Sequence, residues 1–402
     1  MTPPLAVYLG KQCIGTLTLH LGDSSFFTFE ESYLNMPKRP TLSQSFLAAS
    51  GEVVLVAKST RVKLPPFFSN LLPEGHLRDY LAKRGGVNPA REFMLLALLG
   101  DDLPGAVIVK PLKDSSTGES TPEYPNSLTD VKPFHFSLAG IQLKFSAIVK
   151  GNGLTIPADG VGGNWIIKLP AQNFSHVPQN EWAMLHLASA VGIPVPETRL
   201  IKLDHISGLP DLGIFRDTQA LAVKRFDRGE RGKRIHIEDF AQVYNLFPED
   251  KYGKVSYDNI ANMVWVLTGE VGLTDFIRRL TFTILIGNGD MHLKNWSFIY
   301  RDGCTPELTP AYDFVSTIPY IPSDNLALKL SGMKEFRLIT MEHFKKLAIK
   351  AEVPTHLVLK TVQSTVETTL DIWKTTKKNY DLQSDIINRI EKHIDSLLIV
   401  RR

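Results

Sequence analysis

Residues with the chemistry of phosphoryl transfer are grouped in an apolar part of the chain, between residues 284 and 295. Asp290 and Asn295 lie five residues apart there, in a loop that follows a hydrophobic, helix-like segment. In phosphoryl transfer a carboxylate orients the acceptor hydroxyl and takes its proton, and an amide a few residues on can hold a metal ion that bridges phosphates. A further isolated carboxylate, Asp313, is costly to bury unless it is paired or bound to a metal. The order Asp, Asn, Asp, with a hairpin-like segment at residues 296–303 between them, indicates kinase catalytic and metal loops, although each aspartate alone is also typical of a helix or turn cap.

A second candidate group surrounds a lysine at the end of a predicted strand. Residues 165–169 form an apolar, strand-like run from which Lys168 must project, so this lysine needs an anionic partner. Nucleotide phosphates are one candidate partner, and Glu181, at the start of the next predicted helix, is the other. Kinases fix ATP with a strand lysine that a helix glutamate holds in turn. A lysine that only extends from the strand end into solvent is the alternative interpretation.

Small residues precede another lysine within residues 136–144. Ala139 and Gly140 would let backbone N–H groups approach a phosphate, with Lys144 close by. The segment matches neither the Walker A pattern nor the Gly-x-Gly-x-x-Gly pattern, so it indicates little by itself. Other chemistries find less support, because the sequence contains no His-Glu-x-x-His motif, no Gly-x-Ser-x-Gly motif and no paired Cys and His ligands.

The composition is that of a globular protein large enough for two or three cores. The 402 residues are 43% hydrophobic, and a formal net charge of +3 is too small to indicate a general nucleic-acid or membrane binder. Cys13 and Cys304 are the only cysteines, which excludes a disulfide framework and a structural zinc site. The start shows no signal-peptide pattern, and the longest apolar stretch, residues 93–99, is far shorter than the ~20 residues of a membrane span. We therefore expect a cytoplasmic protein with no membrane partner.

The pattern of expected elements divides the chain into four parts. Residues 1–111 predict a small α+β domain, residues 112–131 a polar linker or exposed loop, residues 132–234 a lobe rich in strands, and residues 235–402 a mostly helical lobe. In the first part we expect strands at residues 6–9, 15–19, 26–29 and 53–56, and helices at 77–81 and 89–99 with Pro89 in the first turn. The helical lobe is expected to open with a helix at residues 238–244. Strands first and helices after predict an α+β, two-lobed fold.

Seven segments, in consistent order over residues 5 to 330, resemble the HipA family, the serine/threonine kinase toxins of bacterial HipBA-type type II toxin–antitoxin systems. The segments are residues 67–75, 137–144, 166–168, 180–181, 224–228, 287–295 and 308–313. The resemblance implies a two-lobed, protein-kinase-like fold with a small N-terminal subdomain and a helical C-lobe. It also implies transfer of the γ-phosphate of ATP, with Mg²⁺, to a serine of a target protein. Known targets of the family are aminoacyl-tRNA synthetases, whose phosphorylation halts translation.

The resemblance also assigns roles to individual residues. Asp290 would be the catalytic base, Asn295 and Asp313 the Mg²⁺ ligands, and Lys168, with Glu181 as its partner, would hold phosphates. Ser137 lies where the family autophosphorylates, and a phosphate there should switch the kinase off. The other residues implied at the ATP site are Ala139, Gly140, Ile141, Gln142, Leu143 and Lys144 of the phosphate-covering loop, Lys224, Arg225 and Phe226 of the hinge, and His292 and Tyr312.

The implied partners are a helix-turn-helix antitoxin similar to HipB and, through it, operator DNA. Two residues depart from the family pattern: Lys224 replaces an acid found in some relatives, and Leu143 replaces a polar residue before the loop lysine. The first departure affects side-chain contacts to adenine and the second affects loop closure. Two other functions stay open at this point. One is a catalytically silent co-repressor that acts only through antitoxin and DNA binding, and the other is a kinase with a non-protein acceptor.

Overall fold

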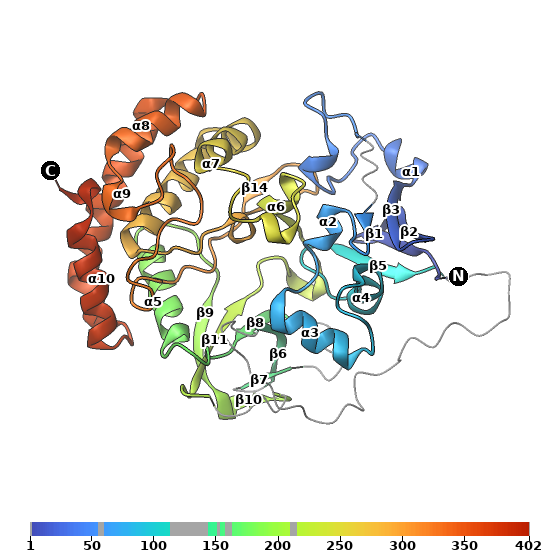
Figure 1. Cartoon of the computed structure of the whole chain (residues 1–402), viewed down its shortest axis with the longest axis horizontal. Coiled ribbons are helices and arrows are strands. Elements are labelled where there is room, and N and C mark those ends of the chain that lie inside the picture. The colour runs from blue at the N-terminus through green and yellow to red at the C-terminus, as the bar shows by residue number, and fades with distance from the viewer. Residues whose placement is uncertain are drawn as a thin grey trace.

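The computed structural model describes residues 2–54, 60–112, 144–150, 153–156, 163–209 and 215–401. Its elements form an N-terminal region, a sheet-rich lobe and a helical lobe, an α+β arrangement that is shown in Figure 1. Ser137 and the predicted phosphate-covering residues 139–143 lie outside the described residues, as do residues 113–131 of the expected linker.

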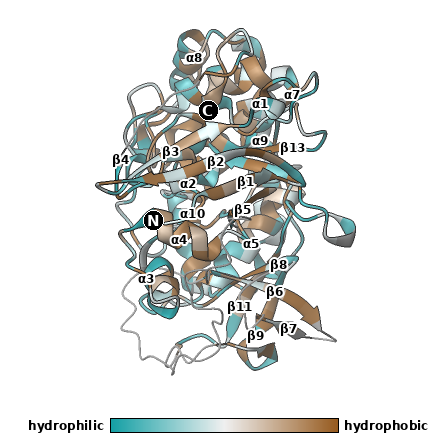
Figure 2. Cartoon of the chain, turned by 90° about the vertical axis from the view of Figure 1, so that its right-hand side faces the viewer, coloured by the Kyte–Doolittle hydropathy of each residue, from teal (hydrophilic) through white to brown (hydrophobic). Residues whose placement is uncertain are grey.

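The N-terminal region is an antiparallel sheet covered by short helices, and Figure 2 views the molecule from its side. The strands, in the order β4-β3-β2-β1-β5, are β1 (Leu5–Leu9), β2 (Gln12–His20), β3 (Ser24–Phe29), β4 (Thr60–Arg61) and β5 (Val107–Pro111). The helices are α1 (Glu31–Leu34), α2 (Pro66–Ser69), α3 (Gly75–Arg84) and α4 (Glu92–Leu99). Ile14 and Leu17 of β2 are buried and join the core that α2 and α4 also form. They are three residues apart because the register between β1 and β2 shifts at Val7 and Tyr8, which leaves Ile14 as the extra residue of a bulge.

One helix start predicted for this region was wrong, and one predicted strand is described only in part. Pro89 lies before α4 and not in its first turn, because the Asn88 side chain accepts a hydrogen bond from the N–H of Ala90 (2.9 Å) and closes a turn there. Val53 makes only an isolated bridge with Leu47. Residues 55 and 56 of that expected strand lie outside the described part.

The second region is a six-stranded sheet that carries both candidate lysines. Its order is β10-β7-β6-β8-β11-β9, and only the β7–β10 pair is parallel. The strands are β6 (Lys144–Lys150), β7 (Gly153–Thr155), β8 (Trp165–Lys168), β9 (Thr198–Lys202), β10 (Ile206–Ser207) and β11 (Gln219–Lys224).

The register of this sheet decides where the lysines point. Lys168 lies opposite Leu221, whose side chain packs in the core that includes α5 (Val177–Ala190), whereas Ile167 joins the core on the other face. Lys144 lies directly opposite Lys168, so both lysines emerge on the α5 side of the sheet.

The third region is mostly helical and contains the largest core. Its helices are α6 (Phe240–Val243), α7 (Tyr257–Ile286), α8 (Met341–Lys350), α9 (Thr355–Thr376) and α10 (Ser384–Ser396), and a small sheet joins β12 (His236–Asp239), β13 (Ser297–Tyr300) and β14 (Glu307–Leu308). The predicted helix at residues 238–244 is instead the end of β12 followed by α6, because the side chain of Asp239 caps α6 at the N–H of Gln242. The β13–β14 hairpin lies where a hairpin was predicted.

Helix α7 is the one helix in the described ranges that is long and apolar enough to cross a membrane by length and composition. Gly269, with a φ of +64°, interrupts it. Residues 276–277 and 279–286, near its C-terminal end, are buried within the protein. Of the apolar 18-residue window of α7 that is long enough to span a membrane, 39% is buried inside the protein.

Candidate active site

The loop that carries Asp290 begins where α7 ends. The helix ends at Gly287, whose φ of +63° lies in the left-handed region that favours glycine. The next residue, Asn288, is completely buried and joins two loops. Its Oδ1 accepts a hydrogen bond from the N–H of Asp290 (3.0 Å), and its Nδ2 donates to the carbonyl of Asp313 (3.2 Å). Asn288 therefore fixes the backbones of the two predicted aspartates relative to each other.

Asp290 and Asn295 lie together in this loop, as their spacing predicts. Asp290 is exposed, and the hydroxyl of Tyr252 donates to its Oδ1 at 2.6 Å. Asn295 ends the short helix η5 (Leu293–Asn295), and its Nδ2 donates to the carbonyl of Asp290 at 2.8 Å. Because Nδ2 is used in this way, the Oδ1 of Asn295 is the side-chain atom left for another partner.

Lys168 is the centre of a buried cluster of charges. Its ammonium group is ion-paired with Glu181 and with Oδ1 of Asp313, and both Lys168 and Glu181 are buried. The other oxygen of Asp313, Oδ2, accepts a hydrogen bond from Nζ of Lys144 at 2.9 Å. The structure thus brings Glu181 to Lys168, one of the two partners that the sequence suggested, and adds Asp313 from a distant part of the chain.

The cluster shifts the pKa values of its members. Burial alone would raise the pKa of Asp313, but the ammonium groups of Lys144 and Lys168 outweigh burial and hold that pKa well below its usual range. Burial alone would lower the pKa of Lys168, but Asp313 and Glu181 outweigh it and raise the value. Lys168 therefore stays cationic and Asp313 anionic near neutral pH.

The backbone of Asp313 is strained. Its φ of +56° lies in the left-handed region, which is uncommon for a residue other than glycine. The bond from Asn288 to its carbonyl and the two lysines on its carboxylate together hold it there. Strain of this kind persists only where the surroundings fix the residue, and it is typical of functional positions.

The donor atoms fit a magnesium ion and a triphosphate. The carboxylate of Asp313 and the Oδ1 of Asn295 are hard oxygen ligands, which Mg²⁺ prefers, and the two lysines present cations on the same side of the sheet. In the part of the chain that the structure describes, no three His, Cys, Asp or Glu side chains are grouped to hold a metal ion. A sparse protein ligand set suits Mg²⁺, which takes much of its coordination from substrate phosphates and water.

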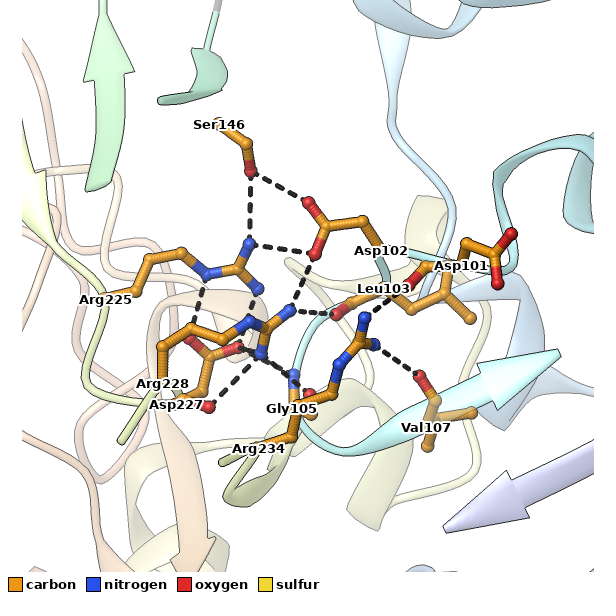
Figure 3. A network of polar contacts seen from close by, with 10 residues as sticks. All are labelled: Asp101, Asp102, Leu103, Gly105, Val107, Ser146, Arg225, Asp227, Arg228 and Arg234. Carbon is orange, nitrogen blue, oxygen red and sulfur yellow. Dashed lines mark hydrogen bonds and ion pairs between the residues drawn. The ribbon is translucent and has the colours of Figure 1, made fainter. Parts of the chain in front are cut away.

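The predicted hinge is anchored to other protein groups. The N–H groups of Lys224 and Arg225 donate to the carbonyls of Glu197 (2.8 Å) and Asn164 (2.7 Å). The guanidinium of Arg225 pairs with Asp227 at 2.8 Å and reaches Asp102 of the N-terminal region at 3.3 Å, within the network of Figure 3. An adenine contact through either of these N–H groups would have to replace an existing bond, and the role of the hinge in nucleotide binding stays a prediction.

The remaining predicted residues lie around residues 287–295, the predicted catalytic loop. The rings of Phe226 and Tyr312 are 5.7 Å apart, and the hydroxyl of Tyr312 donates to the carbonyl of Lys294 at 3.0 Å. His292 is buried, and its Nδ1 has no hydrogen-bond partner among the described residues. Burial lowers the pKa of His292, which favours the neutral ring.

The loop of Asp290 is also held by groups from distant segments, which no sequence motif identifies. Nζ of Lys294 donates to the carbonyl of Asn70 (2.9 Å), to Oδ1 of Asn70 (3.0 Å) and to Oδ2 of Asp239 (3.0 Å). Lys294 belongs to the polar group that drew attention to the loop. Asn70, however, is 224 residues away in the sequence, and no spacing rule connects the two. Tyr252 belongs to none of the motifs.

Comparison with known proteins places this geometry in a family context. The family model described as HipA N-terminal domain matches residues 5–110, and the model described as HipA-like C-terminal domain matches residues 136–373. A protein of Sinorhizobium fredii named "Putative kinase Y4dM" is 46% identical over 403 residues, which cover 99% of this chain and 98% of that protein. The "Serine/threonine-protein kinase toxin HipA" of Shewanella oneidensis is 27% identical over 79% of this chain and 76% of that protein. The solved complex of Shewanella oneidensis HipA with HipB and operator DNA contains a chain of similar fold, with a TM-score of 0.74, 22% identity and coverage of 98% and 96% of the two chains.

Proposed function

The chain belongs to the HipA family, and from that premise we propose that it is an ATP-dependent protein serine/threonine kinase and the toxin of a type II toxin–antitoxin system. One observation carries the proposal. The buried cluster of Lys168, Glu181 and Asp313 is joined through Asn288 to the loop of Asp290. A protein that only bound partners would have no evident need for Lys168, Asp290, Asn295 and Asp313 together, whereas phosphoryl transfer gives each of them a task.

Each residue of the site has a distinct task in the proposed reaction. ATP with Mg²⁺ supplies the γ-phosphoryl group when it is bound. Lys168, which Glu181 holds in place, would contact the phosphates, and Asp313 and the Oδ1 of Asn295 would hold the metal ion. Asp290 is exposed, so it can meet the hydroxyl of an acceptor and take its proton.

The finer parts of the proposal follow from the family. We place the target among the aminoacyl-tRNA synthetases of the cytoplasm and propose that Ser137 is an autophosphorylation site. A phosphate adds close to two negative charges, and beside the loop that precedes Lys144 these charges would oppose nucleotide binding. The fold shared with a HipA chain that was solved with HipB and operator DNA supports a helix-turn-helix antitoxin as the partner and operator DNA as an indirect one.

The test is phosphate transfer from γ-labelled ATP with Mg²⁺ in a bacterial extract, with tRNA removed and with tRNA added. We expect wild type to label a protein and Asp290→Asn to label none while it still binds ATP. Asp371→Asn, an exposed aspartate of α9, is the matched control and should behave as wild type. Mass spectrometry of the labelled band identifies the target, and a peptide map of the chain itself locates any phosphate.

Three outcomes would contradict parts of the proposal. Transfer that persists in Asp290→Asn would show that another group is the base. ATP binding without transfer by wild type would favour the silent co-repressor or a kinase with a non-protein acceptor. A phosphate that maps away from Ser137 would refute the proposed off-switch.

A further inference from the structure

A tyrosine outside the sequence motifs contacts the predicted catalytic base. Tyr252 lies in the turn between the short helix η4 (Pro248–Asp250) and α7, and its hydroxyl donates to Oδ1 of Asp290 at 2.6 Å. Its side chain is 43% exposed, so burial alone does not fix the position of the hydroxyl. Other contacts must hold it.

The turn is fastened to the catalytic loop and to the N-terminal region. The carbonyl of Lys251 accepts a hydrogen bond from the N–H of Leu293 at 3.3 Å, and the ring of Tyr252 lies edge-on to His292 with 4.9 Å between ring centroids. Nζ of Lys251 also pairs with Glu74 at 2.7 Å. Because backbone, ring and neighbouring side chain are all held, the hydroxyl of Tyr252 meets the carboxylate from a fixed direction.

This contact decides which oxygen of Asp290 stays free. A general base must present one oxygen to the acceptor hydroxyl in a fixed orientation. The hydroxyl of Tyr252 occupies Oδ1, and no described residue donates a hydrogen bond to Oδ2. We propose that Tyr252 is a positioning residue, whose hydroxyl holds Oδ1 of Asp290 so that Oδ2 takes the proton of the acceptor. The proposal rests on the kinase function proposed above.

The chemistry of the phenol suits this role. Burial, together with the bond to Asp290, raises the pKa of Tyr252 far above its usual value, so the hydroxyl keeps its proton and remains a donor. The opposite role would be a block, in which the hydroxyl occupies the place of the acceptor. Removal of the hydroxyl separates the two roles, because it lowers the transfer rate in the first case and raises it in the second.

The experiment compares wild type with Tyr252→Phe, which removes the hydroxyl and keeps the ring against His292. We measure the initial rate of label transfer from saturating γ-labelled ATP to protein in extract, and the Kd of a fluorescent ATP analogue. Loss of one hydrogen bond to a charged group should lower the rate about tenfold and leave the Kd within about twofold. The matched control, Tyr380→Phe, removes a hydroxyl that accepts a hydrogen bond from Thr376 at 3.2 Å and should keep the wild-type rate.

Several results would overturn the inference. These are an unchanged or raised rate in Tyr252→Phe, an equal loss in Tyr380→Phe, or a rate loss matched by weaker ATP binding.

A wild type that transfers no label would refute the proposed function, and unfolding then decides whether the contact between Tyr252 and Asp290 exists. Tyr252→Phe should lower the midpoint of urea unfolding in wild type and not in Asp290→Ala. Additive shifts would show that the contact does not exist.

Discussion

Asn70 joins the N-terminal region to the catalytic loop, and we expect its removal to lower both stability and transfer rate. Its side chain is buried at the end of α2. Nδ2 donates to the carbonyls of Leu246 (2.7 Å) and Pro66 (2.9 Å), and Oδ1 accepts from Nζ of Lys294 (3.0 Å). One amide thus binds its own helix, the segment after α6 and the loop of Asp290.

The size of the effect follows from these three bonds. Asn70→Ala removes all of them, at about 1 kcal/mol for each bond between neutral groups and about 1.5 kcal/mol for the bond from the ammonium group. The ammonium group of Lys294 keeps the carbonyl of Asn70 and the carboxylate of Asp239, so it is not left unpaired, and the lower end of the range for charged groups applies. We therefore expect the free energy of unfolding to fall by about 3.5 kcal/mol.

Urea unfolding and label transfer measure the two consequences. The unfolding midpoint should fall, and the transfer rate should fall because Lys294 holds the catalytic loop less firmly. The Kd of an ATP analogue should stay near wild type, because no contact of Asn70 involves Lys168 or Asp313. Asn262→Ala is the matched control, since its Nδ2 donates to the carbonyl of Ala351 (2.9 Å) between α7 and α8, away from this loop. It should lose about 1 kcal/mol and keep its rate.

Two results would refute this reasoning. The first is an unfolding midpoint for Asn70→Ala that equals that of Asn262→Ala, which would show that the bonds to Lys294 and Leu246 add nothing to stability. The second is a full transfer rate in folded Asn70→Ala, which would show that the catalytic loop keeps its geometry without this contact.

Three further predictions concern the buried charges. Burial raises the pKa of Glu238 from 4.5 to about 7, so the folded chain binds the proton of this carboxyl more tightly than the unfolded chain does. The stability that this proton contributes is fully present below about pH 4.5 and is lost as the pH rises through about 7. Urea unfolding at pH 6 and pH 8 should show a smaller pH dependence in Glu238→Gln than in wild type, and equal dependence would contradict the assignment. Glu181→Gln leaves Lys168 paired with Asp313 alone, so titration with an ATP analogue and Mg²⁺ should show about tenfold weaker binding, and unchanged binding would exclude a role of Glu181 in holding Lys168 for the phosphates. Asp227→Ala should cost about 3 kcal/mol in urea unfolding, because it removes the carboxylate that pairs with Arg225 in the buried network, and a loss below about 0.5 kcal/mol would show that Asp102 replaces it.

The sequence predicts the fold class and the first half of the site because both depend on local pattern. Alternation and strand length place Lys168 at the end of β8, as the structure shows. The next helix begins at Val177, four residues before the predicted start, and carries Glu181 in its second turn, where it reaches Lys168. Local turn chemistry was harder to read. The side chain of Asn88 closes a turn before α4, and the side chain of Asp239 caps α6. Because of these two hydrogen bonds, both helices begin later in the chain than the sequence predicts.

The second half of the site depends on contacts between distant segments, and local pattern carries no information about them. Asp313 reaches Lys168 across 145 residues, and Asn70 reaches Lys294 across 224. Sequence spacing identifies such residues as polar and unusual but not as partners, because the topology of three packed regions decides which of them meet. Tyr252 illustrates the limit, since a tyrosine before a helix is ordinary and only its contact with Asp290 gives it meaning.

The N-terminal region contacts two parts of the proposed kinase, the predicted hinge and the predicted catalytic loop. Through Asn70 it contacts the predicted catalytic loop, and through Asp102 it pairs with Arg225 of the predicted hinge (3.3 Å) and with Arg228 just after it (2.8 Å), as Figure 3 shows. Asn70 follows α2 and Asp102 follows α4, and both helices pack in one hydrophobic core, so we expect the two contacts to move together. A substitution at one contact should therefore also alter the other contact. On this argument the N-terminal region stabilises the relative position of the hinge and the catalytic loop, so the other two regions alone would not form a complete kinase.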